Sequence, residues 1–392
     1  MRILYLSSKL LQIIEVPLTL QKIGYEVAIY KNTLEDVECN LELQQQFDSF
    51  IRENAVDVLI SNTFCVYAAE CTCNYEIPYI VYGMDSPHYT LWQEQAKYKN
   101  VYLFQFDSRE CELLRKSGYQ NVWYMPLAAR NADRLVINEQ DIRKYRADIS
   151  FVGSAYTVNV FDELAAGFPE NIVDTATNIM ETTAFIWDGV ERVIPRLKEE
   201  VSPSWDKLYD MFRQTSTHKK LEIDKEYLLG HFLINRKLTN LERNMIFELL
   251  AENYDFRLYT REEEKVSPKI KRYGEVDADT EALKVFYSSK INLNLTLRSI
   301  ERGVPLRIFD IMSVGGFVLT DYRVDAEELF EEDKDIVMYR SPEEMLEKID
   351  YYLVHEEERK RIAYNGYCKV KQNYSYQKQL EKILEIVRAY HF

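Results

Sequence analysis

Residues 292–321, NLNLTLRSIERGVPLRIFDIMSVGGFVLTD, have the pattern of a strand, a polar loop, a short helix, a glycine turn and a second strand. Pro305 suits the first position of the helix, where its missing N–H costs nothing. Gly315 and Gly316 then stop the helix and turn the chain. Strands that alternate with helices in this way indicate an α/β protein with a parallel sheet.

Two charged residues, Arg307 and Asp310, lie in this helix. Arg307 is in the first turn, beside backbone N–H groups that have no partner within the helix, which is a natural place to hold a diphosphate. Asp310 follows three residues later and therefore shares a helical face with Arg307. Such a pair can hold a nucleotide at its phosphates and its ribose. The alternative is an ordinary surface ion pair on a buried helix.

The composition fits a globular protein of two domains, with 392 residues, 46% hydrophobic and 29% charged. No run of about eighteen apolar residues predicts a transmembrane helix. The N-terminal MRILYLSSKLL alternates like a first strand and lacks the cleavage site of a signal peptide, so we expect a cytoplasmic protein. The net charge of −15 argues against nucleic acid or an anionic membrane as the main partner.

Metal ligands are not apparent in the sequence. The six cysteines include one close pair, Cys71 and Cys73, without a second pair or a nearby histidine, and we interpret them as structural thiols. Asp277 and Asp279 have the spacing of an acidic metal-binding motif. They precede a helix, however, where aspartate commonly acts as a cap. We therefore expect no metal site.

The first third of the chain alternates short apolar strands with helices, which predicts a parallel sheet. We expect strands at residues 2–6, 26–30, 56–61, 78–81, 101–106 and 122–126, and helices at residues 11–22 and 41–53. Ligands of such sheets lie beyond the carboxyl ends of the strands. The loops at that edge are residues 7–9, 62–63, 83–89 and 107–108. No GxGxxG follows the first strand, so the dinucleotide fingerprint is absent.

Loop 83–89 contains Asp85, Ser86 and His88 directly after a buried strand. A carboxylate, a hydroxyl and an imidazole at this edge can position or deprotonate a substrate hydroxyl. The alternative is a structural turn, in which Asp85 and Ser86 bind local backbone groups and Pro87 sets the bend.

A second α/β unit begins with the strand ADISFVG at residues 147–153. Gly153 and Ser154 follow it, and such small residues let a ligand or a backbone approach closely. A long helical block covers about residues 160–253. The α/β pattern resumes at residues 256–259 and continues to a last helix at about residues 376–390.

Several segments, in their order and spacing, make the chain resemble the CgeB-like (spore-maturation protein type) family of GT-B glycosyltransferases over nearly its full length. The N-terminal half carries IPYIVYGMDSPHYTLW, FQFDSRE and NVWYMPLAA. The C-terminal half carries DISFVGS, LTNLERNMIFELLAENYDFRLYT, RYGEV, the stretch quoted first and HEEERKRIAYNGYCKV.

The resemblance implies two Rossmann-like domains that face a cleft. Residues 1–135 form the acceptor domain, and residues 136–375 form the nucleotide-sugar (donor) domain with a helical insertion at about 155–253. Residues 376–392 form a C-terminal helix that packs back on the N-terminal domain. The implied reaction moves a sugar from a UDP-linked nucleotide diphosphate sugar to a hydroxyl of a glycan, a protein or a surface glycoconjugate. It needs no metal, because helix N-termini and basic side chains neutralise the diphosphate.

The resemblance also implies roles for residues of the donor domain. Arg307 neutralises the diphosphate leaving group, and Asp310 holds the ribose. Gly153 and Ser154 admit the phosphates or the donor sugar. Tyr273 and Gly274 border the base.

In the acceptor domain, Asp85 is the expected base if the reaction inverts, and His88 bonds the donor sugar or the acceptor. The stereochemistry stays open, because related retaining enzymes have a Glu-x7-Glu pattern. Here Asp310 takes the second position and the nearest preceding acid, Glu301, lies nine residues back. Two other functions fit the same fold: a non-catalytic nucleotide-sugar-binding subunit of a glycan assembly, and a nucleotide-sugar epimerase.

Overall fold

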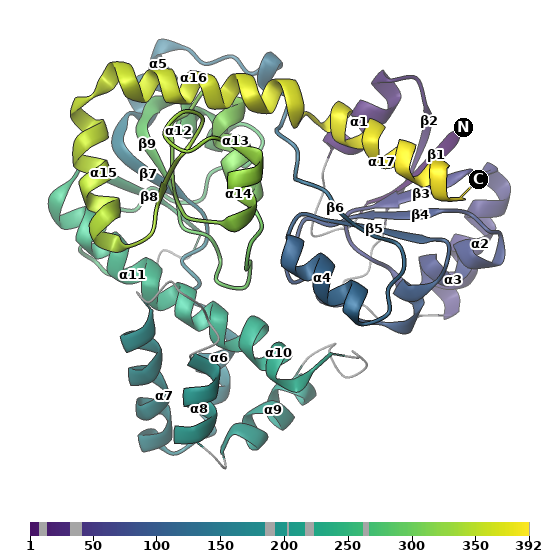
Figure 1. Cartoon of the computed structure of the whole chain (residues 1–392), viewed down its shortest axis with the longest axis horizontal. Helices are drawn as coiled ribbons and strands as arrows, with labels where there is room; N and C mark the ends of the chain where they lie inside the picture. The colour runs from purple at the N-terminus through teal and green to yellow at the C-terminus, as the bar shows by residue number, and fades with distance from the viewer. Residues whose placement is uncertain are drawn as a thin grey trace.

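The computed structural model describes residues 1–7, 14–31, 41–184, 193–201, 204–215, 223–261 and 266–391. Two parallel β-sheets dominate it (Figure 1), which confirms the α/β architecture predicted from the sequence. The first sheet has the strand order β2-β1-β3-β4-β5-β6 and the second has the order β11-β10-β9-β7-β8.

The N-terminal sheet consists of six strands: β1 (Arg2–Ser7), β2 (Glu26–Lys31), β3 (Val58–Ser61), β4 (Tyr79–Tyr82), β5 (Val101–Gln105) and β6 (Val122–Tyr124). Its covering helices are α1 (Glu15–Lys22), α2 (Leu41–Asn54), α3 (Val66–Asn74) and α4 (Ser108–Lys116). Every residue of β3, β4 and β5 is buried, because helices cover both faces of a parallel sheet.

The last helix of the chain, α17 (Tyr376–His391), packs against α1 of the N-terminal domain (Figure 1). Its Gln379 side chain donates to the carbonyl of Pro126 at 3.1 Å. The Tyr102 hydroxyl lies 3.1 Å from His391 Nδ1. The N-terminal domain is therefore built from both ends of the chain.

The C-terminal sheet consists of β7 (Ala147–Val152), β8 (Phe256–Tyr259), β9 (Ser289–Asn294), β10 (Val318–Asp321) and β11 (Val337–Tyr339). Its helices are α5 (Glu139–Tyr145), α12 (Glu281–Ser288), α13 (Leu306–Ser313), α14 (Val324–Leu329), α15 (Pro342–Val354) and α16 (Glu356–Asn373). The short helix between β9 and β10 is thus the one expected from residues 292–321.

The segment that connects β7 to β8 in the sequence forms a separate lobe of helices (Figure 1). It contains α6 (Val160–Ala165), α7 (Glu170–Thr183), α8 (Val193–Glu200), α9 (Ser204–Thr215), α10 (Lys225–Leu229), a π-helical turn (Gly230–Ile234) and α11 (Asn235–Asn253). The lobe has an apolar core of its own. It also touches the N-terminal domain, where the rings of Tyr89 and Phe232 lie 5.9 Å apart.

Some predicted boundaries differ from the observed ones. The strand expected from residue 56 begins at Val58, which is the first residue paired with β1, although Asp57 N already binds the carbonyl of Arg2. Residues 11–13 of the first expected helix, and residues 8 and 9 of the first expected loop, lie outside the described residues. None of the described helices is both long enough and apolar enough to cross a membrane.

Candidate functional site

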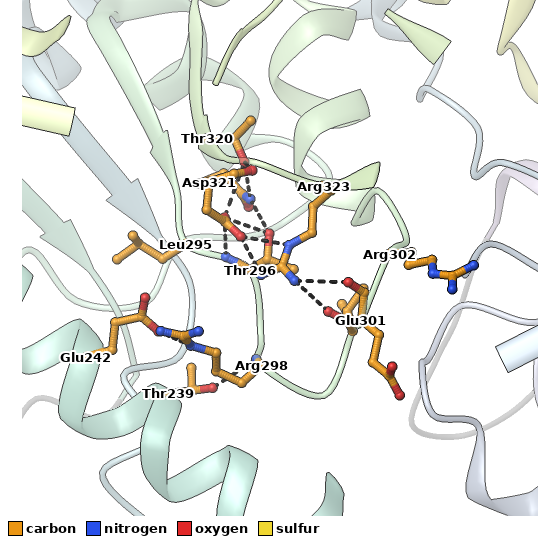
Figure 2. A network of polar contacts seen from close by, with 12 residues as sticks. Thr239, Glu242, Leu295, Thr296, Arg298, Glu301, Arg302, Thr320, Asp321 and Arg323 are labelled. Carbon is orange, nitrogen blue, oxygen red and sulfur yellow. Dashed lines mark hydrogen bonds and ion pairs between the residues drawn. The ribbon is translucent and has the colours of Figure 1, made fainter. Parts of the chain in front are cut away.

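The loop at residues 295–305 joins β9 to α13 and is fixed by a polar network at the carboxyl edge of the C-terminal sheet (Figure 2). Asp321 Oδ1 accepts hydrogen bonds from the backbone N–H and the hydroxyl of Thr296, both at 2.8 Å. Arg323 Nε donates to Asp321 Oδ2 at 2.7 Å, and Arg323 Nη1 reaches the carbonyl of Ile300 at 2.8 Å. The loop therefore holds α13 in a defined place.

The other side of the loop is tied to α11 of the helical lobe. Arg298 donates from its backbone N–H to the Thr239 hydroxyl at 3.1 Å and from Nε to Glu242 Oε2 at 2.8 Å (Figure 2). Burial raises the pKa of Glu242, and the Arg298 guanidinium opposes that shift. The lobe thus contributes directly to the position of the loop.

Helix α13 begins without a capping side chain among the described residues. Pro305 occupies the cap position in an extended conformation, one residue before the first helical position predicted for it. Arg307 in its first turn is partly buried, with its guanidinium carbon 5.3 Å from the centre of the Phe286 ring. It makes no hydrogen bond or ion pair to a described residue. Burial lowers the pKa of Arg307, and the Asp310 carboxylate opposes this effect. A desolvated cation beside open backbone N–H groups is a site for an anion.

Two further guanidinium groups, Arg130 and Arg243, are near enough to act electrostatically on Arg307. Arg243 Nη1 donates to the carbonyl of Ser154 at 2.5 Å, and Arg243 Nη2 bonds the carbonyl of Leu295. The structure therefore brings the turn at Gly153 and Ser154, predicted as part of the site, into the same cationic region as Arg307.

Asp310 is 5% exposed, and its Oδ1 accepts a hydrogen bond from Arg130 Nε at 2.9 Å. Burial raises the pKa of Asp310, whereas Arg130 and then Arg307 oppose the shift. The sequence predicted Arg307 as the neighbour of this carboxylate. The bonded cation is instead Arg130, which lies 180 residues earlier and has no local sequence signal.

Tyr273 and Gly274 lie beside the edge strand β8. The Tyr273 ring is 5.3 Å from that of Tyr259, and its backbone N–H binds the carbonyl of Leu258 at 2.9 Å. Gly274 has φ of +80°, a left-handed conformation that favours glycine. No recorded contact within the described residues joins this pair to Arg307, so its place beside the base stays a prediction.

The N-terminal edge carries a buried polar cluster. His88 is 1% exposed, and its backbone N–H donates to Glu110 Oε1 at 2.5 Å. Its Nδ1 lies 3.5 Å from Gln105 Nε2, whereas Nε2 is buried with no hydrogen-bond partner among the described residues. Burial lowers the pKa of His88, and the charge of exposed Asp85 opposes this. His88 is therefore neutral at neutral pH.

The same edge contacts the donor-side loop directly. Asp107 caps α4 by accepting from Arg109 N at 2.9 Å, and it accepts from Ser86 Oγ at 3.1 Å. Across the domain boundary it accepts from the backbone N–H groups of Glu301 and Arg302 at 2.8 and 3.3 Å. The sequence predicted residues 107–108 as a loop at this edge, but it did not predict their contact with the other domain.

A second carboxylate completes this contact between the domains. Asp325 accepts from Ser108 N at 2.9 Å and from Ser108 Oγ at 2.6 Å. Gly303 lets the backbones meet, since a Cβ there would lie 2.8 Å from the carbonyl oxygen of Phe106. We call the bonds of Asp107 and Asp325 to the facing domain the interdomain clamp.

Glu301 contacts side chains of the N-terminal domain and of the helical lobe. Its carboxylate is 3.4 Å from Arg109 Nε and 3.3 Å from Nε2 of His231 in the helical lobe. Burial lowers the pKa of His231 to about 4, so this histidine is neutral at neutral pH. Glu301 therefore joins three parts of the molecule.

The acidic pair considered as a metal motif acts differently. Asp277 Oδ1 accepts from Asp279 N at 3.1 Å and from Thr280 Oγ1 at 2.6 Å, and Asp279 forms an ion pair with Arg130. Within the part of the chain that the structure describes, no group of three or more His, Cys, Asp or Glu is arranged to hold a metal ion.

A family model described as "Glycosyl transferase-like" matches residues 236–385. No curated protein matches the chain. Three solved structures align with 99% of this chain: HepE of Anabaena in complex with UDP and glucose, sucrose-phosphate synthase of Thermosynechococcus elongatus, and a glycosyltransferase of Rickettsia africae. Their TM-scores are 0.54, 0.55 and 0.53, their identities 11%, 10% and 13%, and 100%, 98% and 98% of their own chains are covered.

The chain has the GT-B fold. At these identities the likeness establishes the architecture alone, and it confirms the two Rossmann-like domains predicted from the sequence. In this GT-B chain the loop before α13 carries both the bonds to Asp107 and the connection to Arg307. The arrangement therefore couples the place of the candidate anion site to the contact between the domains.

Proposed function

We propose that the protein is a glycosyltransferase that moves a sugar from a nucleotide diphosphate sugar, UDP-linked, to a hydroxyl acceptor, in the cytoplasm and without a metal ion. The observation that carries this proposal is the open N-terminus of α13, where Arg307 has no bonded partner among the described residues. The GT-B fold, the family model and the UDP and glucose named for HepE support it.

The donor would lie along the carboxyl edge of the C-terminal sheet. Arg307 and the backbone N–H groups of α13 would hold the diphosphate, with Gly153 and Ser154 close to the phosphates or the sugar. Asp310 would accept hydrogen bonds from the ribose. Cations and backbone dipoles aimed at the leaving group stabilise the charge that develops as the bond between the sugar and the diphosphate breaks.

The acceptor would approach from the N-terminal domain. Its hydroxyl oxygen forms the new bond to the sugar, and its proton must leave. If the reaction inverts, Asp85, which is exposed, would take that proton. The neutral His88 would donate a hydrogen bond from Nε2 once a substrate reaches this atom, which is buried in the structure. If the reaction retains, both residues would position the substrates.

Calorimetric titration with UDP and UDP-glucose in the presence of EDTA tests the donor site. We expect binding without added metal. Binding that appears only after magnesium is restored would contradict the proposal that α13 and Arg307 hold the diphosphate without a metal ion. Incubation with candidate acceptors, followed by product analysis, then tests the reaction: binding without turnover would point to a non-catalytic subunit, and a new nucleotide sugar made without acceptor to an epimerase.

A further inference from the structure

Arg130 lies on the segment that connects the two domains, and three carboxylates from different parts of the chain surround it. Its Nε donates to Asp310 Oδ1 at 2.9 Å. Glu15 of α1 lies 3.8 Å from Nη1, and Asp279, before α12, forms an ion pair with the same group. The Arg130 side chain is only 14% exposed, so desolvation favours paired over unpaired charges here.

The two oxygens of Asp310 have different surroundings. Oδ1 accepts from Arg130, whereas Oδ2 makes no hydrogen bond to any described residue. The side chain retains 8% exposure. A carboxylate oxygen can accept two hydrogen bonds. Because the bond from Arg130 fixes Oδ1, it also fixes the direction of Oδ2. Asp310 lies on the same helix as Arg307.

We propose that Arg130 is a positioning residue of the donor site, which holds Asp310 through Oδ1 so that Oδ2 accepts hydrogen bonds from the ribose hydroxyls of the nucleotide sugar. This inference rests on the proposed function and extends it to the segment between the domains. Fixing a binding side chain by a bonded neighbour reduces the ordering that the ligand must supply.

The charges around Asp310 show why an arginine is needed. Burial raises the pKa of this carboxyl, Arg130 and Arg307 oppose that shift, and Glu15 adds to it. Tyr376 of α17 also faces the pair, and burial holds its pKa well above the usual value, so it stays neutral. Arg307 is the cation assigned to the diphosphate. Without Arg130, Asp310 would therefore be protonated over a wider pH range and would lose acceptor capacity.

The test measures the affinity of UDP-glucose between about pH 5.5 and pH 8.5, where the diphosphate diester and the uracil do not titrate, for the wild type and for Arg130→Met. We expect a nearly flat profile in the wild type. In Arg130→Met the affinity should fall by about tenfold at the acidic end and recover as the pH rises. Arg130→Lys should restore most of the wild-type profile. The matched control Arg143→Met, at an exposed arginine of α5 whose ion pair is with Glu139, should leave it unchanged.

Arg130→Met leaves a buried carboxylate unpaired and for that reason can fail to fold. In that case a second pair of variants tests the positioning role of Arg130. Asp310→Asn and the double variant Arg130→Met/Asp310→Asn should bind UDP-glucose equally, both without pH dependence, because Arg130 acts through Asp310.

A wild-type pH profile in a folded Arg130→Met, or a double variant that binds more weakly than Asp310→Asn, would overturn the positioning role while leaving the proposed function intact. Absence of UDP-glucose binding in the wild type would instead overturn the proposed function, and this inference with it.

Discussion

Helices α4 and α13 both begin at the boundary between the domains, and their first turns are opposite in charge. At α4 the protein supplies two carboxylates of its own, Asp107 and Asp325, which bind backbone N–H groups of the first turn. At α13 no described side chain caps the helix, and Arg307 lies in the first turn with Arg130 and Arg243 around it.

The difference shows how one physical property serves two purposes. Any helix N-terminus attracts negative charge. In α4 that attraction is satisfied internally, and because Asp325 comes from the other domain, it joins the domains. In α13 no described side chain satisfies it, and the arginines increase it. A helix start that is satisfied internally is structural, whereas one that is left open is a candidate binding site.

The largest effect is expected at α4. Asp107→Ala removes the cap of α4 and leaves two N–H groups of the facing domain without their acceptor. We expect a loss of about 2–4 kcal/mol in the free energy of unfolding, measured by denaturant titration. The control is Glu112→Gln, whose ion pairs with Arg302 and Arg109 are partly exposed and should contribute less than about 1 kcal/mol. Equal losses in the two variants would contradict the role of Asp107 in the clamp.

The next effect is expected at α13. Arg307→Ala should weaken UDP-glucose binding by about 1.5–3 kcal/mol, and it should also lower turnover, because the developing diphosphate charge loses a partner. Stability should change little, since Arg307 has no bonded partner among the described residues. Calorimetry and thermal melting measure the two quantities. Wild-type affinity in Arg307→Ala and in Asp310→Asn would remove α13 from the site.

A smaller effect separates chemistry from structure in the N-terminal domain. Asp85→Asn should reduce turnover at least about tenfold, because loss of general-base action typically costs 10²–10⁴-fold. Nucleotide affinity should remain nearly unchanged, since Asp85 lies in the other domain from α13. Steady-state kinetics with the true acceptor give the answer, and unchanged turnover in a well-folded variant would make this loop a structural turn.

The smallest effect concerns pH. Burial raises the pKa of Glu110 well above its usual value, and the backbone N–H of His88 opposes that shift. A carboxyl whose folded pKa is raised contributes stability that is present below its unfolded pKa and is lost as the pH rises through the folded pKa.

Glu110→Gln keeps an acceptor for the His88 N–H but cannot ionise. The melting temperature of Glu110→Gln minus that of the wild type should therefore be larger at pH 8 than at pH 5. A difference that is the same at both pH values would show that Glu110 does not titrate in this range.

The parts of the fold set by local sequence were predictable. Alternating apolar strands gave both sheets, and Pro305 with Gly315 marked the limits of α13. The loops at 83–89 and 107–108 were placed at the correct edge, because the carboxyl ends of parallel strands share one side of a sheet.

The long-range pairs were not predictable. Arg130 with Asp310 and Ser108 with Asp325 are separated by 180 and 217 residues. These bonds depend on how two domains pack, and neither partner carries a local pattern that announces the other.

The return of α17 to the N-terminal domain has a mechanical consequence. The chain crosses between the domains at Ala129 and again at Tyr374, and the two crossings lie side by side, with Ala129 N bonded to the carbonyl of Tyr374 at 2.7 Å and Ala129 paired with Ser375. A single tether lets two bodies swivel freely. Two connecting segments bonded to each other resist twisting, so bending across the pair remains the easy motion. For the domains to part by that motion, the bonds of the interdomain clamp must break.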